Sequence, residues 1–291
     1  MASLDDLRKR IVSVKSTQKI TKAMKMVAAA KLRKAQESAE RGRPYSEKMQ
    51  NIILNLTESI SDPLNAPKLL VGTGKEQTHL CVIMTSDRGL CGGFNTNICR
   101  LAKNYFLKVL EEGKTLKIIT IGSKGHDQLK REYGKYIVQK LSFKERKKIS
   151  FNEANDVRKI IIDLFDKNEF DKCILFYNNF KNVMTQIPQA QQIIPAEKNK
   201  KFKKDNEVFY EFEPDEDEIL EDLLPKNIST QIFKAFLENS ASEQGSRMTA
   251  MDSATRNAGD LVKSLTIVYN RSRQAAITKE LIEIISGAES L

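Results

Sequence analysis

The stretch from residue 4 to residue 39 reads LDDLRKRIVSVKSTQKITKAMKMVAAAKLRKAQESA and contains neither glycine nor proline. Apolar residues recur in it at steps of three and four, which is the seam of a coiled-coil helix. The seam consists of Leu4, Leu7, Ile11 and Val14, followed by smaller or more polar residues at Gln18, Thr21, Lys25, Ala28, Leu32, Ala35 and Ala39. A single helix cannot bury such a stripe, so the pattern predicts a partner helix.

A second apolar stripe begins on another face of this helix, at Ile20, Met24 and Val27. If the seam packs against a partner helix, the second stripe is left to contact something else. The helix is expected to run to about residue 60, because Gly42 and Pro44 are the only breakers. At 1.5 Å per residue its length would be roughly 80 Å, unless Pro44 kinks it.

The other end of the chain has a matching pattern. A helix is expected from Pro225, taken as its first residue, to about Ser286, with a length of roughly 90 Å. Its seam consists of Met248, Met251, Thr255, Ala258, Val262, Leu265, Tyr269, Ser272 and Ala276. Two helices of similar length at opposite ends of the chain predict an antiparallel two-helix coiled coil.

Between these helices, short apolar runs alternate with helical patterns. The expected strands are residues 79–85, 116–121 and 172–177, and the expected helices are 95–112, 123–133 and 152–167. This alternation indicates parallel βαβ units. Residues 184–194 and 208–212 could add edge strands, and 198–204, with five lysines, is expected to be an exposed loop.

The predicted fold class is therefore α+β or α/β. The N- and C-terminal helices form a long antiparallel coiled coil, and a Rossmann-like α/β domain is inserted between them. We expect residues 1–60 to be the N-terminal coiled-coil helix, 61–215 the inserted domain and 216–291 the C-terminal coiled-coil helix.

Composition excludes several classes of protein. Of the 291 residues 30% are charged, and no apolar run approaches the roughly 20 residues that cross a bilayer. The first 15 residues lack the apolar core of a secretory signal. The four cysteines form no C-x-x-C pair and only two histidines could join them, so we expect no metal site and no cofactor.

The net charge of +10 is concentrated in the N-terminal helix. Residues 1–50 carry thirteen Lys or Arg against five acidic residues, whereas residues 250–291 carry five of each. A Lys-rich helix can bind nucleic acid, anionic lipid or an acidic protein. Residues 1–40 contain no aromatic residue for stacking on bases, and the helix thins to alanine at residues 28–30, where a membrane-surface helix would be bulky. An acidic protein partner is favoured, and a basic coiled-coil scaffold or nucleic-acid-binding protein is the alternative.

The loop Ser86–Phe94, SDRGLCGGF, follows a strand and precedes a helix, where Rossmann folds bind phosphates. Its glycines do not match G-x-G-x-x-G and no acidic residue closes the next strand, so a tight turn with positive φ is favoured over a nucleotide site. Neither His79 nor His126 has a nucleophile beside it in a known arrangement. We therefore expect no enzyme activity of the chain by itself, with a nucleotide-binding α/β enzyme as a second alternative.

Four blocks of the chain resemble signature segments of the ATP synthase gamma subunit family. They are residues 20–32 (ITKAMKMVAAAKL), 86–95 (SDRGLCGGFN), 243–260 (EQGSRMTAMDSATRNAGD) and 269–287 (YNRSRQAAITKELIEIISG). The blocks cover both coiled-coil arms and the first turn of the inserted domain. The chain lacks the cysteine-bearing insertion of chloroplast members, so it resembles the bacterial and mitochondrial kind.

The resemblance implies a non-catalytic subunit, the central rotor shaft of a proton-translocating F-type ATP synthase. Such a shaft couples proton flow through the c-ring to conformational change at the beta-subunit catalytic sites, and it regulates ATPase activity and proton flow. The implied partners are the alpha and beta subunits of the catalytic head, an epsilon-type subunit and the membrane c-ring, with no nucleic acid and no directly bound nucleotide. The implied location is peripheral, on the cytoplasmic face of a bacterial inner membrane or, alternatively, on the matrix side of the mitochondrial inner membrane.

The same resemblance implies six contacts with the beta subunit. By position in the matching blocks, Met24, near Lys25, would face a beta-subunit loop, and four residues of the C-terminal helix would contact the beta catch loops. Those four are Arg247, Gln274, Thr278 and Glu280. Without the resemblance, all six would be interpreted as parts of an exposed helix face.

Overall fold

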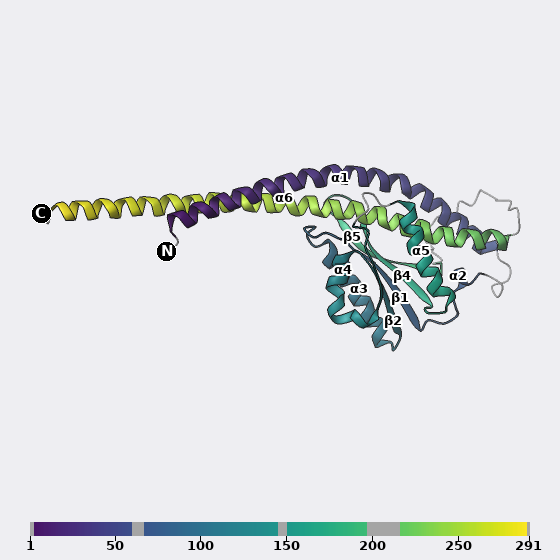
Figure 1. Cartoon of the computed structure of the whole chain (residues 1–291). Helices are drawn as coiled ribbons and strands as arrows, with labels where there is room; N and C mark the ends of the chain where they lie inside the picture. The colour runs from purple at the N-terminus through teal and green to yellow at the C-terminus, as the bar shows by residue number, and fades with distance from the viewer. Residues whose placement is uncertain (1–2, 60–66, 145–149, 197–215, 290–291) are drawn as a thin grey trace. The chain divides into compact units, whose positions relative to one another are not determined.

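The computed structural model describes residues 3–59, 67–144, 150–196 and 216–289 (Figure 1). The chain forms two compact units, one of Met1–Ala29 with Arg247–Leu291 and the other of Ala30–Ser246. In chain order the elements are α1 (Leu4–Ser59), α2 (Lys68–Val71), β1 (Thr78–Met84), α3 (Phe94–Glu111), β2 (Thr115–Ile121), α4 (Ser123–Tyr133), the 3-10 helix η1 (Gly134–Tyr136), β3 (Ile137–Leu141), α5 (Phe151–Asp166), β4 (Lys172–Phe180), β5 (Gln186–Ile194) and α6 (Glu216–Glu289).

The five strands of the second unit form one sheet in the order β3-β2-β1-β4-β5. β1 pairs in parallel with both β2 and β4, β2 pairs in parallel with β3, and β5 runs antiparallel to β4 at the edge. This confirms the predicted βαβ arrangement, a Rossmann-like sheet inserted between two long terminal helices.

The central strand β1 separates two apolar layers. Leu80, Val82 and Met84 face α5 and α6, whereas Cys81 and Ile83 face α3 and α4, because successive side chains of a strand point to opposite faces. All five side chains have no exposed surface. Burial on both faces explains why this strand is a continuous apolar run in the sequence instead of an alternating one.

The expectation that Pro225 begins the C-terminal helix was wrong. α6 begins at Glu216 and Pro225 lies inside it, although an interior proline costs about 3 kcal/mol and removes one backbone hydrogen bond. The turns before the proline are held by packing, since Leu220 and Leu224 are buried against Met49 and Ile53 of α1. Pro44 likewise lies inside α1, whose end at Ser59 agrees with the predicted length.

The remaining strand and helix predictions agree with the structure to within a few residues. The possible edge strand at 184–194 is confirmed as β5, whereas β3 and the short helix α2 were not predicted. The expected strand at 208–212 and the lysine loop at 198–204 lie outside the described residues. The proposed domain limits at 60/61 and 215/216 border or fall within such residues as well, so that division stays a prediction.

The side chain of Asp171 fastens the segment that leads into β1. Its carboxylate accepts hydrogen bonds from the hydroxyl of Thr73 at 2.5 Å and from the backbone N–H groups of Gln77 and Thr78 at 3.0 and 2.9 Å. Burial acts to raise the pKa of this carboxyl, but the three hydrogen bonds outweigh it and the pKa is lowered. The charged form of Asp171 therefore stabilises the folded state.

We expect Asp171→Asn to lower the free energy of unfolding by about 1 kcal/mol near pH 7. Because the folded-state pKa is depressed, the stabilisation is present above the unfolded pKa of about 4 and is lost as the pH falls through the folded pKa. Urea titrations of both proteins between about pH 6 and pH 3 should show the difference shrinking with acid. A difference that stays constant over this range would contradict the assignment.

Candidate functional site: the paired helices of the terminal unit

In the unit of Met1–Ala29 and Arg247–Leu291, α1 and α6 lie side by side and run in opposite directions (Figure 1). The hydroxyl oxygens of Thr21 and Thr255 are 2.8 Å apart, and Lys25 Nζ lies 2.5 Å from Asp252 Oδ1. As residue numbers rise along α1 from 21 to 25, the residue numbers opposite them on α6 fall from 255 to 252. The predicted antiparallel coiled coil is confirmed.

The predicted seam coincides with the helix contact. All of its members in α1, from Leu4 to Ala39, are buried or half-buried, and so are those in α6 from Met248 to Ser272. Ala276 is exposed, so the seam was predicted one member too far. With Lys25 opposite Asp252, residue 276 lies beyond the level of Leu4, where α1 begins.

Two polar pairs occupy the middle of this seam. Thr255 donates to the backbone carbonyl of Met251 at 2.7 Å while its oxygen contacts Thr21. The hydrogen bond from Lys25 lowers the pKa of Asp252, and a second bond from Arg256 adds to the effect. Polar pairs in a coiled-coil seam fix the register of the helices, and these pairs do so here.

Three of the six predicted contact residues belong to the paired part of the unit. Met24 and Arg247 are half-buried. Lys25 is half-buried too and already forms the ion pair with Asp252, a partner that the sequence did not reveal. Ile20 and Val27 are 59% and 56% exposed, so these two members of the second apolar stripe of α1 face outward, whereas Met24 is half-buried.

The other three predicted residues, Gln274, Thr278 and Glu280, are exposed on the part of α6 that extends past the start of α1 (Figure 1). At about 100° per residue, Thr278 lies about 40° from Gln274 around the helix, but Glu280 lies about 160° from Thr278. Arg247 is roughly 40 Å from Gln274 along the axis. The six residues therefore occupy two levels and several faces of one helical unit, and do not form a single pocket.

The same end of α6 carries large apolar side chains that were not singled out from the sequence. They are between 49% and 63% exposed, and they are Ile277, Leu281, Ile282, Ile284 and Ile285. The signal was present, because helical spacing places Ile277, Leu281 and Ile284 on one face. It was missed because an apolar stripe is normally assigned to a core.

The Ser86–Phe94 loop is a turn closed by its own hydrogen bonds. Leu90 and Gly92 have positive φ values of 63° and 55°, as predicted for a tight turn. Asn95 accepts from the backbone N–H of Ser86 at 2.9 Å and donates to its hydroxyl at 2.8 Å. Asp87 accepts from the N–H of Ser123 at 2.9 Å, so this carboxylate caps the start of α4.

Both histidines have lowered pKa values. His79 is 3% exposed and its Nδ1 lies 2.7 Å from the hydroxyl of Tyr105. Burial, and then the positive charge of Lys114, lower the pKa of His79. Burial, and then the positive charge of Lys140, lower the pKa of His126. Within the described residues no cluster of three or more His, Cys, Asp or Glu side chains could hold a metal ion.

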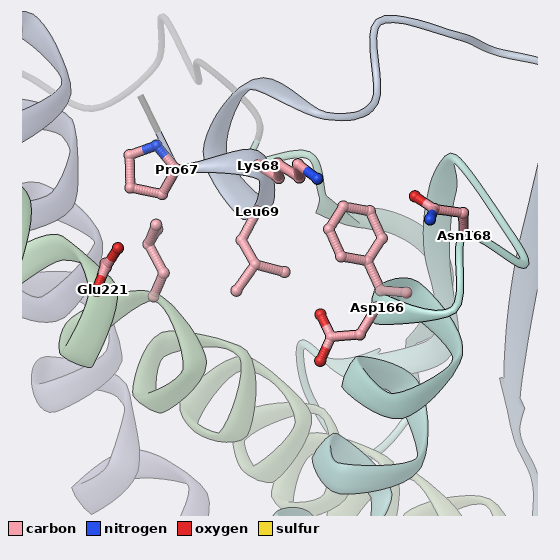
Figure 2. A pocket seen from close by; sticks show the side chains of 8 residues that line it. Pro67, Lys68, Leu69, Asp166, Asn168 and Glu221 are labelled. Carbon is pink, nitrogen blue, oxygen red and sulfur yellow. The ribbon is translucent and has the colours of Figure 1, made fainter. Parts of the chain in front are cut away.

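A hollow of about 430 Å³ opens in the α/β unit between α2, α5 and α6 (Figure 2). Leu69, Asp166 and Glu221 approach it from these three helices. Its lining residues are Pro67, Lys68, Leu69, Phe165, Asp166, Asn168, Glu221 and Leu224. Serine, cysteine and histidine are not among these lining residues.

Paired terminal helices that expose large apolar side chains, in a chain that also forms an α/β domain, are typical of a subunit that binds other proteins. Sequence comparison gives its family. The family model described as ATP synthase matches residues 3–291. Over the full length of both chains, the protein is 72% identical to the ATP synthase gamma chain of Pelagibacter ubique (strain HTCC1062) and 55% identical over 294 aligned residues to that of Rhizobium etli (strain CIAT 652).

Solved structures agree with the fold. A chain of the Tetrahymena thermophila mitochondrial ATP synthase central stalk and c-ring has a TM-score of 0.60 at 26% identity, covering 81% of this chain and 99% of that one. A chain of the Euglena gracilis mitochondrial ATP synthase OSCP/F1/c-ring structure has a TM-score of 0.69 at 21% identity, covering 99% of this chain and 94% of that one. The chain belongs to the ATP synthase family, and within it its relatives are gamma chains.

The register of the two helices can be tested by cross-linking. In Thr21→Cys/Thr255→Cys, mild oxidation should form a disulfide almost completely, because these side chains face each other with oxygens 2.8 Å apart. The four natural cysteines are buried, and burial raises the pKa of Cys99 to about 11, so they should not react. Non-reducing electrophoresis after a single proteolytic cut measures the yield.

The matched control for this test is Thr17→Cys/Thr255→Cys, since Thr17 is exposed on the same helix and bonds to Ser13. It should remain uncross-linked. Equal yields in the two double variants would contradict the register.

Proposed function

We propose that this chain is the central rotor shaft of an F-type ATP synthase, coupling proton flow through a c-ring to conformational change at beta-subunit catalytic sites. The observation that carries the proposal is the end of α6, where a helix without a partner in the described chain exposes a row of large apolar side chains. Membership of the ATP synthase family and the likeness to central-stalk chains support it. The chain itself is a non-catalytic subunit.

The exposed apolar end of α6 requires a cover. Complete burial of one such side chain is worth roughly 1.5–3 kcal/mol, so covering five that are about half exposed contributes several kcal/mol. Isolated apolar side chains on a surface are ordinary, but a contiguous row marks a protein interface. An apolar collar formed by the alpha and beta subunits around this end would supply the cover and would still allow rotation, because apolar contacts have little directionality.

Six residues on several faces, all of them polar except Met24, would supply the directional contacts. Met24, Lys25 and Arg247 lie at one level of the paired helices, and Gln274, Thr278 and Glu280 at the other. Since Thr278 and Glu280 point to nearly opposite sides, beta subunits arranged around the shaft would meet different groups at any one rotation angle. We propose that these contacts bias each beta site in turn, and by reciprocity that nucleotide occupancy biases the angle of the shaft.

The chain works within a membrane-associated ATP synthase. Its described helices include none that is long and apolar enough to span a membrane. We propose that the chain lies on the cytoplasmic face of a bacterial inner membrane and is held there by its partner subunits. The gamma-chain relatives from bacteria support this choice.

The contact residues can be tested in a complex assembled from this chain and alpha and beta subunits. Arg247→Ala and Glu280→Ala should each lower the ATPase rate, or the rotation rate at saturating ATP, by the order of tenfold. That is the effect of losing one charge-assisted hydrogen bond in the transition state. Glu280→Ala should leave the fold unchanged because Glu280 is exposed, and the circular dichroism and melting temperature of Arg247→Ala check the fold at the half-buried position.

Asp260→Ala is the matched control, because Asp260 is an exposed acid of α6 that pairs only weakly with Lys263, at 3.7 Å. Its rate should equal that of the unaltered protein. Unaltered rates in both test variants would refute the site assignment, while leaving the proposed shaft open to the test of rotation.

A further inference from the structure

The α/β unit contains one ion pair that joins both terminal helices to the sheet. The carboxylate of Glu238 on α6 is only 3% exposed, whereas the side chain of its partner Arg43 on α1 is 37% exposed. Arg43 donates to the two carboxylate oxygens from Nε at 2.7 Å and from Nη2 at 3.1 Å. This two-point geometry fixes the orientation of both side chains.

The same pair also holds the end of β4. Phe180 donates its backbone N–H to Glu238 at 3.0 Å, and its carbonyl accepts from Arg43 Nη2 at 3.0 Å. One residue of the sheet is thus bonded to a residue of each helix, which are bonded to one another. Nothing in this closed ring of hydrogen bonds can turn without breaking at least one of them.

Further contacts extend the attachment of α6 along the carboxyl ends of the strands. Asn239 accepts from the backbone N–H of Asn178 at 3.1 Å, and Ser242 donates to the carbonyl of Asn178 at 3.2 Å. Ser246 donates to the carbonyl of Cys91 at 2.6 Å. In open α/β sheets this edge, where the strand order reverses beside β1, is the usual place for a ligand. Here α6 fills it.

Neighbouring side chains pack closely against two helix glycines of this unit. A Cβ on Gly42, the neighbour of Arg43, would lie 2.9 Å from Leu237 of α6, and one on Gly245 would lie 3.3 Å from the ring of Phe180. Glycine inside a helix is unfavourable by itself. Glycine at these two positions leaves room for the side chains of Leu237 and Phe180.

We propose that Arg43 and Glu238 form a clamp that makes the sheet of the α/β unit turn rigidly with the segments of α1 and α6 in that unit, so that torque passes between sheet and helices without slack. This inference rests on the proposed rotary function. Arg43 and Glu238 are positioning residues, because neither touches a reacting group.

The test measures stiffness in the complex of this chain with alpha and beta subunits. A bead is attached to the α/β unit through Lys108→Cys, an exposed position, and its angular fluctuations are recorded while the head is fixed and paused. Glu238→Gln and Arg43→Lys should each widen the angular variance about twofold or more. Arg43→Lys keeps the charge but cannot form two parallel hydrogen bonds to the carboxylate. Because the site of Arg43 is partly exposed, this variant is expected to fold.

Arg33→Lys is the control, since Arg33 is 87% exposed and pairs with Glu37 of its own helix at 3.4 Å. Its variance should match that of the unaltered chain. Variances equal to the unaltered value in assembled Arg43→Lys, with an unchanged melting temperature, would overturn the clamp. If the unaltered chain itself fails to join the alpha–beta ring, the proposed rotary function fails instead.

Discussion

The antiparallel pairing of α1 with α6 is the constraint on which the rest of the structure depends, because each helix carries a stripe that only the other can cover. The pairing joins the two ends of the chain, and it leaves the residues between them to form a separate α/β fold. The polar pairs Thr21–Thr255 and Lys25–Asp252 fix the register. As a consequence of that register, α6 extends past the first residue of α1, and the last turns of α6 expose apolar side chains.

The α/β unit has the topology of a ligand-binding domain but serves another purpose. Its phosphate-type loop is closed on itself, and the edge of the sheet at which ligands usually bind is filled by Asn239, Ser242 and Ser246 of α6. A fold used elsewhere to bind small molecules here binds a helix of its own chain. The chemistry of such a subunit lies in its partners, and the rigidity that we propose for the sheet and its helices would be its own contribution.

Much of the fold could be predicted because period and length are properties of the local sequence. The seam of α1 and the buried apolar run of β1 could therefore be predicted. The start of α6 could not be predicted, because a proline such as Pro225 usually marks the first turn of a helix. The turns before Pro225 are kept helical by the tertiary packing of Leu220 and Leu224. β3 was missed because IVQKL is short and half polar, as suits an edge strand.

The functional residues divide in the same way. Resemblance to a family proposes contacts such as Arg247 and Glu280, but it cannot show that Lys25 is already paired with Asp252. Arg43 and Glu238 are separated by most of the sequence of the α/β unit. In the sequence, Arg43 stands between Gly42 and Pro44, which are typical helix breakers, so nothing local indicates the ion pair. Contacts between residues far apart in the chain depend on the final packing, which no local pattern encodes.

The central claim, that this chain is a rotating shaft, is tested most directly by watching it turn. The chain is assembled with alpha and beta subunits, the head is fixed to a surface, and a bead is attached through Lys108→Cys on the α/β unit. We expect rotation in one direction that requires ATP and stops when ATP is removed. An active alpha–beta ring that excludes the chain, or that hydrolyses ATP while the attached bead shows only Brownian motion, would contradict the account.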